Sequence, residues 1–335
     1  MKQMYSEAIS LINAATRIVV IQAENPDGDS LGSSLALEEL LGDQGKDVTM
    51  YCAIDMPKYL RYVRGWDRVT NQFPYDADLA IIVDTAAEAL LQKCLSTPAV
   101  RSFLESHPVL VLDHHGENSE DAQNDLSFHH TFIMSESAAA TGELIYDMAS
   151  SLGWTISPQA ASHLYVSIAS DTLGLTTPNS TPETFQTVAD LVKLGAVPYE
   201  IENARREYMK KPADILRYKA ELITRIEYLL DGKLAIVHIP WEDIQEYSDR
   251  YNPSILVLDE MRLVEGVLIA CAIKTYPDSK LTGKLRTNAP LANIIAGYFG
   301  GGGHNYSAGF KVYESYEQTV SELITATSKA LKEIA

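Results

Sequence analysis

The chain has 335 residues, more than one hydrophobic core usually supports, so we expect two domains. Its hydrophobic content of 46% and charged content of 21% are near the averages for soluble domains, and no apolar run approaches the roughly 20 residues that span a bilayer. The formal charge of −18 argues against a broad surface for long duplex nucleic acid, because affinity for duplexes comes mostly from Lys and Arg. The negative charge does not exclude a small anionic substrate, since metal ions can supply positive charge locally.

The N-terminal residues favour a cytoplasmic protein. Glu7 and Arg17 interrupt the first apolar stretch at helical spacing, which is typical of an amphipathic helix and not of a signal peptide. Cys52, Cys94 and Cys271 are widely spaced and form no CxxC pair. This pattern predicts buried, reduced thiols, with neither a disulfide framework nor a zinc site.

Apolar strand-like runs alternate with helical patterns through the first half of the chain. The strands are expected at residues 17–23, 47–53, 78–84 and 108–113, and the clearest helices at 30–44, 137–152 and 158–170. Such alternation favours a parallel sheet with crossover helices on its faces.

The second half changes character twice. Residues 182–230 have a helical pattern throughout, after which strands are expected at 233–239, 264–274 and 280–286, followed by helices at 292–299 and from 315 on. We therefore predict an α/β fold in three parts, with an active-site cleft between the two domains. The parts are an N-terminal parallel-sheet catalytic domain at 1–190, a helical linker at 191–230, and a smaller C-terminal α/β substrate-binding domain at 231–335.

Metal-binding side chains follow several of the expected strands. The segment NPDGDSLGS at 25–33 places two carboxylates between the first strand and its helix, and further candidates follow later strands or close a helix. These candidates are Asp27, Asp29, Asp84, His114, His115 and Asp171. Carboxylates and imidazole without thiolate favour manganese, magnesium or zinc-like ions. A pair of such ions can activate water and polarise a phosphoryl oxygen, so the pattern predicts a metal-dependent phosphoesterase.

Each of these residues also has a simpler interpretation. A lone Asp after a strand is commonly a turn or capping residue, and the pair His129-His130 shows that adjacent histidines occur elsewhere in this chain. The glycine run at 300–303 has the alternative reading of a flexible loop. The occurrence of all these segments together and in order favours the metal site.

These segments together resemble the DHH family of phosphoesterases. NPDGDSLGS is similar to the first motif of the family, AIIVDT to its second, LDHH to the motif that names it, and SIASDTLGL to its fourth. GKLRT and GGGGHNYSAGF resemble the C-terminal substrate-binding domain of the family. The length is similar to the nanoRNase and pAp phosphatase branch. Members of that branch act on short oligonucleotides and small nucleotides.

The resemblance implies a role for each matching residue. Asp27 would bind one manganese ion, Asp29, His114 and Asp171 would bind the other, and Asp84 would bridge them, with Mg²⁺ as the alternative ion. His115 would lie beside the substrate phosphate and Asp113 would orient the histidines. Arg286 and His304 would contact the substrate, and Gly301, Gly302 and Gly303 would allow close backbone approach. The implied partner is a nucleotide or short single-stranded oligonucleotide, with no long duplex and no membrane; a homodimer is left open.

One departure from the family pattern concerns Ala23, where this branch usually has a histidine. The first ion is expected to bind more weakly unless Glu24, Gln22 or a water replaces the missing ligand. Three functions therefore stay open. They are a phosphoesterase that hydrolyses short oligonucleotides, linear dinucleotides or 3′,5′-bisphosphorylated nucleosides, a weakened or silent nucleotide-binding protein, and a pyrophosphatase-type hydrolase.

Overall fold

The computed structural model describes residues 5–115, 124–248 and 251–333. The chain divides into two compact units, Met1–Lys210 and Lys211–Ala335, and each is described below by itself. Among the helices of the described residues, none is both long enough and apolar enough to cross a membrane.

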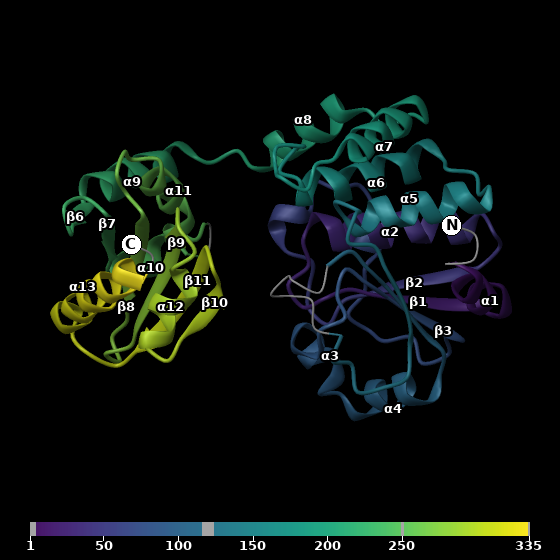
Figure 1. The fold of residues 1–335 in the computed structure, drawn as a ribbon, viewed down its shortest axis with the longest axis horizontal. Helices are drawn as coiled ribbons and strands as arrows, with labels where there is room; N and C mark the ends of the chain where they lie inside the picture. The colour runs from purple at the N-terminus through teal and green to yellow at the C-terminus, as the bar shows by residue number, and fades with distance from the viewer. Residues whose placement is uncertain (1–4, 116–123, 249–250, 334–335) are drawn as a thin grey trace. The chain divides into compact units, whose positions relative to one another are not determined.

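In its described residues the first unit is built on a five-stranded sheet in which all strands run parallel, in the order β2-β1-β3-β4-β5 (Figure 1). The strands are β1 (Arg17–Ile21), β2 (Asp47–Tyr51), β3 (Leu79–Val83), β4 (Val109–Asp113) and β5 (Thr131–Met134). Every residue of β3 and β4 is buried, as expected for parallel strands covered on both faces. The predicted parallel α/β architecture is therefore confirmed.

Helices cover both faces of this sheet. The first face carries α1 (Ser6–Ala14), α2 (Gly28–Gly42), α5 (Thr141–Leu152) and α6 (Pro158–Asp171), and the other carries α3 (Gln92–Leu95) and α4 (Pro98–Ser106). Short 3-10 turns complete the layers at η1 (Lys58–Leu60), η2 (Trp66–Arg68) and η3 (Glu88–Leu91). Helices α2 and α6 pack so closely that a Cβ at Gly32 would lie 2.6 Å from the carbonyl oxygen of His163. Gly32 thus allows the close contact of the two helices, which brings the beginning of α2 near the end of α6.

The expected linker at 191–230 differs from the observed division of the chain. Helices α7 (Pro182–Lys193) and α8 (Pro198–Tyr208) belong to the first unit, where Leu191 and Ala196 join the core beside α6. Helix α9 (Ala213–Thr224) instead packs in the second unit through Ile215, Tyr218 and Leu222. The helical periodicity predicted these helices. It does not indicate which of the two units each helix packs against.

The second unit contains a mixed six-stranded sheet in the order β10-β11-β9-β8-β7-β6, as far as the described residues extend. The strands are β6 (Glu227–Leu229), β7 (Leu234–Ile239), β8 (Ile269–Thr275), β9 (Leu281–Thr287), β10 (Gly302–His304) and β11 (Ser307–Val312). Residues 227–229, which the sequence predicted as helix, form an edge strand paired with β7. Three residues are too few for helical periodicity to exclude a strand.

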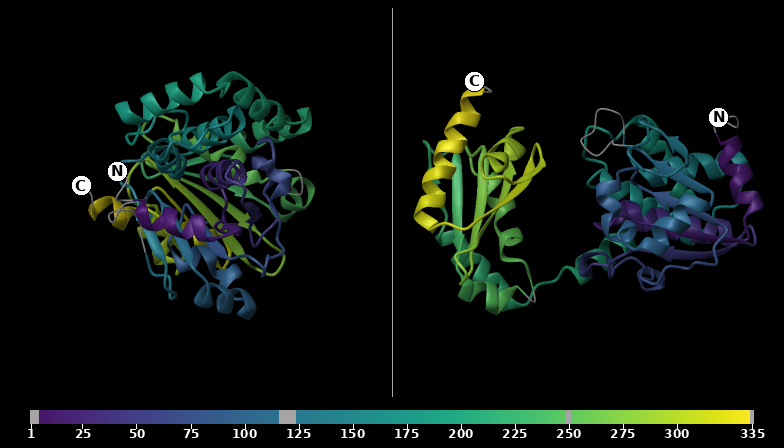
Figure 2. Two further views of the ribbon diagram at one scale, coloured as in Figure 1. Left: turned by 90° about the vertical axis from the view of Figure 1, so that its right-hand side faces the viewer. Right: turned by 90° about the horizontal axis from the view of Figure 1, so that it is seen from below.

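The two faces of the second sheet are covered unequally. Helices α12 (Ala292–Tyr298) and α13 (Tyr316–Glu333) pack on one face, and Figure 2 shows α13 lying along it. On the other face α9, α10 (Trp241–Tyr247), η4 (Pro253–Leu256) and α11 (Leu258–Arg262) pack over β7 and β8. Strand β9 alternates buried and partly exposed residues, and its partly exposed set is Thr282, Lys284 and Arg286. Lys284 and Arg286 of β9 therefore lie on the face of the sheet that carries α9, next to the strands β7 and β8 that the helices cover.

Candidate metal centre and basic face

Asp27 ends the loop after β1 and caps α2. Its Oδ1 accepts hydrogen bonds from the backbone N–H groups of Asp29 at 2.9 Å and Ser30 at 3.0 Å, and the Ser30 hydroxyl accepts one from the Asp27 N–H. This reciprocal capping box explains why the chain turns into a helix here. The capping role is therefore real, and it uses only one of the two carboxylate oxygens.

Asp29 is fully buried and held by hydrogen bonds from two distant helices. Its Oδ1 accepts from the hydroxyls of Ser33 at 2.9 Å and Ser167 at 2.6 Å, and its Oδ2 accepts from the Thr141 N–H at 2.7 Å. Burial opposes ionisation, but the charge of His114 and these hydrogen bonds hold the pKa of Asp29 below its ordinary value. The side chain is thus a fixed, ionised carboxylate.

Asp84 follows β3 in a left-handed backbone conformation with φ of 64°. Asp tolerates this region better than most residues. The Asp84 N–H donates to the Leu112 carbonyl, which continues the sheet pairing with β4, and the Thr141 hydroxyl lies 3.3 Å from Oδ1. Burial first, and then the charges of neighbouring carboxylates, raise the pKa of Asp84 well above its ordinary value. This acid group has more negative charge around it than the described side chains neutralise.

His114 brings three carboxylates to one ring nitrogen. Its Nε2 lies 3.0 Å from Asp171 Oδ2 at the end of α6, 3.5 Å from Asp29 Oδ2 and 3.6 Å from Asp84 Oδ1. The atom is buried, and its geometry leaves it without a satisfied hydrogen bond in the described residues. Burial would lower the pKa of His114, but the contact with Asp171 and the nearby charges raise it to about 9. A proton on one imidazole is a poor match for three carboxylates.

His115 is oriented by Asp113. Its Nδ1 lies 2.7 Å from Asp113 Oδ1, and the same oxygen accepts the backbone N–H groups of His114 and His115. A carboxylate on one ring nitrogen fixes the tautomer and leaves the other nitrogen for a ligand or proton. The sequence led us to expect Asp113 behind both rings, whereas the described contacts pair it with the ring of His115 alone.

These residues fit a divalent metal ion. Asp29, His114 and Asp171 offer ligand atoms within 4.8 Å of one another, and so do Asp84, His114 and His115. Burial and the charges of Asp171 and Asp29 also raise the pKa of Asp27 to about 6, although Asp27 belongs to neither group. Carboxylate and imidazole atoms are the donors that manganese and magnesium accept in proteins. The two groups share His114, so the described residues offer adjoining positions for ions.

The surroundings of Ala23 bear on the missing histidine. The Glu24 carboxylate accepts hydrogen bonds from the backbone N–H groups of Lys93 and Cys94 in α3, so it is already engaged there. Gln22 is 1% exposed, and within the described residues neither polar atom of its side chain has a hydrogen-bond partner. Of the two side chains expected as replacements, only Gln22 has its polar atoms free.

The acid cluster predicts how the metal-free protein responds to pH. Asp27 has a folded pKa of about 6 against 3.8, and His114 about 9 against 6.5. Groups with raised pKa values favour the folded state below their unfolded values, and this contribution is lost as pH rises through the folded values. Between about pH 4 and pH 9 the free energy of unfolding should fall, on the order of 1–3 kcal/mol. The stabilisation from ionised Asp29 is present throughout this range, because its pKa of 3.8 in the unfolded chain lies below it.

Urea unfolding in chelator and in manganese measures this effect. Manganese should remove the loss, because it binds the deprotonated ligands. Asp84→Asn should make the metal-free dependence shallower, which separates the cluster from the general acidity of the chain. A metal-free stability that is constant or rises between pH 5 and pH 8 would contradict the assignment.

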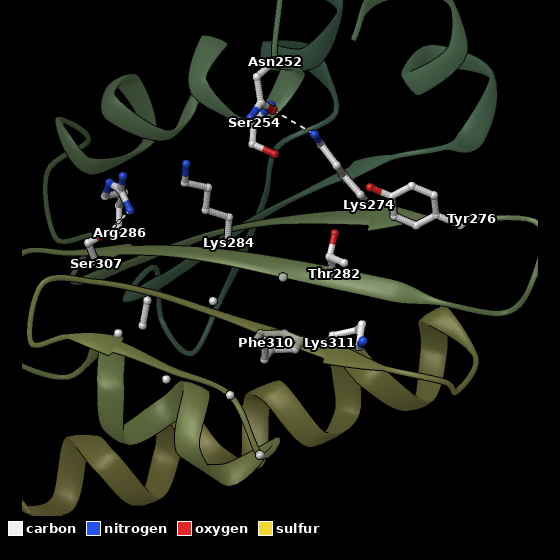
Figure 3. A pocket seen from close by; sticks show the side chains of 17 residues that line it. Asn252, Ser254, Lys274, Tyr276, Thr282, Lys284, Arg286, Ser307, Phe310 and Lys311 are labelled. Carbon is white, nitrogen blue, oxygen red and sulfur yellow. Dashed lines mark hydrogen bonds between the residues drawn. The ribbon is translucent and has the colours of Figure 1, made fainter. Parts of the chain in front are cut away.

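Arg286 lies in a cavity of about 740 Å³ on the partly exposed face of the second sheet. Figure 3 shows Lys274, Lys284 and Arg286 directed from the sheet toward the segment with Asn252 and Ser254. The ammonium of Lys274 donates to Asn252 Oδ1 at 2.8 Å, and Arg286 donates to the Ser307 hydroxyl. Burial, and then the neighbouring cation in each case, lowers the pKa values of Lys274 and Lys284, and burial also lowers that of Arg286. These cations repel one another, so an anion would stabilise them.

The glycine run at 300–303 lines part of this cavity. Close packing against β11 explains why two of these positions are glycine. Strand β10 pairs with β11, and a Cβ at Gly301 would lie 2.3 Å from the Gly309 carbonyl oxygen. Gly303 has a φ of 141°, and a Cβ there would lie 2.6 Å from the Cα of Ala308. The observed close approach is therefore to β11, while approach to a substrate stays a prediction. His304 ends β10, but its side chain lies outside the described part of the structure.

Two lysines of the basic face were not among the residues expected from the sequence. Lys284 alternates with Arg286 along β9, and Lys274 pairs opposite Thr282 from β8. The alternation GKLRT contained the signal for Lys284, because residues two apart on a strand share a face. Lys274 could be added only once the strand register was known.

Known proteins resemble this chain in its first unit and along most of its length. Residues 17–169 match the family model described as the N-terminal domain of the DHH family. A bifunctional oligoribonuclease and PAP phosphatase NrnA from Thermus thermophilus is 27% identical over 314 residues, covering 90% of this chain and 88% of its own. The Bacillus subtilis protein of the same description is 21% identical, with 92% and 94% covered. Residues 17–169 therefore resemble the N-terminal domain of the DHH family.

Solved structures have a similar fold. An exopolyphosphatase-related protein from Bacteroides fragilis has a TM-score of 0.81 at 21% identity and covers 98% of this chain and 96% of its own. RecJ from Thermus thermophilus, solved in complex with Mn²⁺, has a TM-score of 0.52 at 13% identity over 99% of this chain and 54% of its own. At these identities the likeness concerns the fold.

Proposed function

We propose that this protein is a metal-dependent phosphoesterase that hydrolyses short oligonucleotides, linear dinucleotides or 3′,5′-bisphosphorylated nucleosides. The observation that carries the proposal is the convergence of Asp29, Asp84 and Asp171 within 3.6 Å of His114 Nε2. A buried group of like charges is costly without a cation. Their placement at one sheet edge is therefore explained by a metal-binding role.

Each residue of the cluster has a proposed task. Asp29, Asp84, His114 and Asp171 hold the ions, and the spare oxygen of Asp27 contributes to a second, weaker position. When bound, divalent ions activate water and neutralise the charge that develops on the phosphoryl group. Asp113 holds the ring of His115, whose Nε2 then contacts the phosphate or joins the ligands. Asp29 keeps its geometry through hydrogen bonds to α5 and α6, so the cluster is preorganised.

Manganese is the proposed ion, with magnesium as the alternative. The donors support either ion, because they are oxygen and imidazole atoms without thiolate. The structural neighbour RecJ was solved in complex with Mn²⁺. The stronger preference of imidazole for transition metals over magnesium favours manganese at a cluster that contains His114 and His115.

The names of the curated relatives favour turnover over a silent binding protein. The Thermus and Bacillus relatives are described as bifunctional oligoribonucleases and PAP phosphatases, and each aligns along nearly its whole length. Purified protein with manganese and a panel of pApA, pAp, short RNA, cyclic dinucleotides and pyrophosphate tests the assignment. Release of mononucleotide from pApA or phosphate from pAp is expected. Cleavage of pyrophosphate alone, or binding of nucleotides without product, would establish one of the alternatives.

The basic face is proposed to bind substrate phosphates. Arg286→Ala should raise KM roughly 10–150-fold and change kcat little, since a charge-assisted hydrogen bond contributes about 1.5–3 kcal/mol. Steady-state kinetics on pApA measures both constants. Arg217→Ala is the matched control, because Arg217 is an exposed arginine of α9 in the same unit and outside the cavity. An unchanged KM for every phosphate-bearing substrate would separate this face from recognition.

A further inference from the structure

A second cavity adjoins the candidate metal centre within the first unit. Its volume is about 560 Å³, within the range of small-molecule sites. Asp27 and Gly28 form one wall, α6 and the residues after it form another, and η1 and α8 complete it. Asp27 is thus shared between the cavity and the proposed ion-binding loop.

The lining of this cavity is aromatic and apolar for the most part. Three tyrosine side chains, Tyr59, Tyr62 and Tyr165, contribute to it together with Leu60 and Val166. The Tyr59 hydroxyl donates to the Pro26 carbonyl oxygen at 2.7 Å, which fixes this ring against the loop that carries Asp27. The aromatic wall is therefore tied directly to the metal-binding loop.

The rim contains an exposed leucine in an unusual conformation. Leu173 lines the cavity, is 75% exposed and has a φ of 47°. A leucine in the left-handed region is rare and costs conformational energy. It follows Asp171 by two residues, so the chain that leaves the candidate site presents an apolar side chain to this cavity.

The charges of the lining disfavour a second phosphate group. Arg205 donates to the Glu202 carboxylate from Nε at 2.6 Å and from Nη2 at 2.9 Å. Glu202 also accepts a hydrogen bond from Arg206, which lies outside the cavity. Among the lining residues Asp27 and Glu202 are acidic and Arg205 is basic. A neutral ring fits this balance better than an anion does.

We propose that this cavity binds the nucleobase of a nucleotide that carries the scissile phosphate. The assignment rests on the proposed phosphoesterase function, and it adds a base-binding subsite to it. A base is joined through its sugar to the phosphate, so the two must bind at adjoining positions, as the shared Asp27 wall provides. Aromatic side chains stack on any base, which suits an enzyme that accepts different short oligonucleotides.

The test compares pApA with two analogues in which one or the other adenosine is replaced by an abasic ribose. Stacking of one base corresponds to about 5–100-fold in affinity, so at least one analogue should lose that much in kcat/KM with the wild type. Tyr165→Ala should reduce this ratio toward one. Tyr199→Ala, on α8 but outside the cavity and 76% exposed, should preserve it. Wild-type protein that hydrolyses both analogues as well as pApA, or a ratio unchanged in Tyr165→Ala, would overturn the proposal.

A binding measurement keeps the subsite separate from catalysis. Calorimetry in manganese with AMP and with ribose 5-phosphate asks whether the base contributes affinity. Wild-type protein should bind AMP about 5–100-fold more tightly, and Tyr165→Ala should lose most of that difference. If no substrate is hydrolysed but this difference is present, the phosphoesterase assignment fails and the base subsite stands. Equal binding of the two ligands by the wild type overturns the base subsite, whatever the enzyme hydrolyses.

Discussion

Asp84→Asn is expected to abolish hydrolysis while the protein stays folded. Asp84 belongs to one of the two ligand groups, together with His114 and His115. Its Oδ1 also lies 3.6 Å from His114 Nε2, the nitrogen that faces Asp29 and Asp171 of the other group. We therefore expect both ion positions to depend on Asp84. Even changes beside direct ligands reduce metal affinity or activity 10–100-fold. Loss of this carboxylate should therefore reduce kcat by at least about 100-fold. Asparagine tolerates the left-handed backbone at this position and fills nearly the same volume.

Stability provides the control for this substitution. Removing one of several repelling carboxylates should leave the metal-free protein at least as resistant to urea as the wild type. Asp147→Asn is the matched variant, because Asp147 is an acid on α5 of the same unit and belongs to neither ligand group. It should retain activity. Near-normal turnover by Asp84→Asn would show that Asp84 only shapes the turn after β3.

Ala23→His is expected to lower the manganese concentration for half-maximal activity at least about 10–100-fold. Ala23 follows β1 in the segment that leads to Asp27, and it is 6% exposed. The neighbouring Glu24 is engaged with α3 and does not replace an imidazole. A histidine in the position used by this branch of the family should thus add a nitrogen ligand beside Asp27.

Activity titrated with manganese measures the change, and Ala23→Leu controls for added bulk without a ligand atom. A wild type that is inert at millimolar manganese, with an active Ala23→His variant, would identify a silenced binding protein. If the wild type is active and the histidine has no effect, Ala23 is not a lost ligand. Water would then complete the first position, or the amide of Gln22, which has no hydrogen-bond partner in the described part of the chain.

The sequence predicted the strands of the first unit closely because parallel strands buried on both faces appear as continuous apolar runs. Strands β1 to β4 each lie within the expected ranges. The edge strand β5 was missed, because its apolar run is only four residues long and most of these residues are only partly buried. The division at Lys210 was also missed, since periodicity identifies a helix without naming its packing partner.

Site residues were predictable where they belong to compact motifs. Asp27, Asp29, Asp84, His114 and Asp171 could be named from their positions after strands or at a helix end. Burial and neighbouring carboxylates raise the pKa values of the three acids other than Asp29. Burial opposes the other two shifts, yet the contact with Asp171 raises the pKa of His114, and the charge of His114 holds that of Asp29 down.

The supporting contacts of the site could not be predicted. The Asp29 carboxylate receives hydrogen bonds from Thr141 and Ser167, which lie 112 and 138 positions away in the chain. Such contacts depend on the close packing of α2 with α5 and α6. Neither residue belongs to a ligand pattern, so the sequence offered no local signal for them.

Crystals soaked in manganese, with anomalous scattering recorded near the manganese edge, test the central claim most directly. We expect an ion bound by Asp29, Asp84, His114 and Asp171, at direct ligand distances of about 2.0–2.2 Å. A second, weaker peak is expected beside Asp27. An empty cluster in crystals that bind manganese elsewhere would contradict the metal centre and, with it, the proposed chemistry.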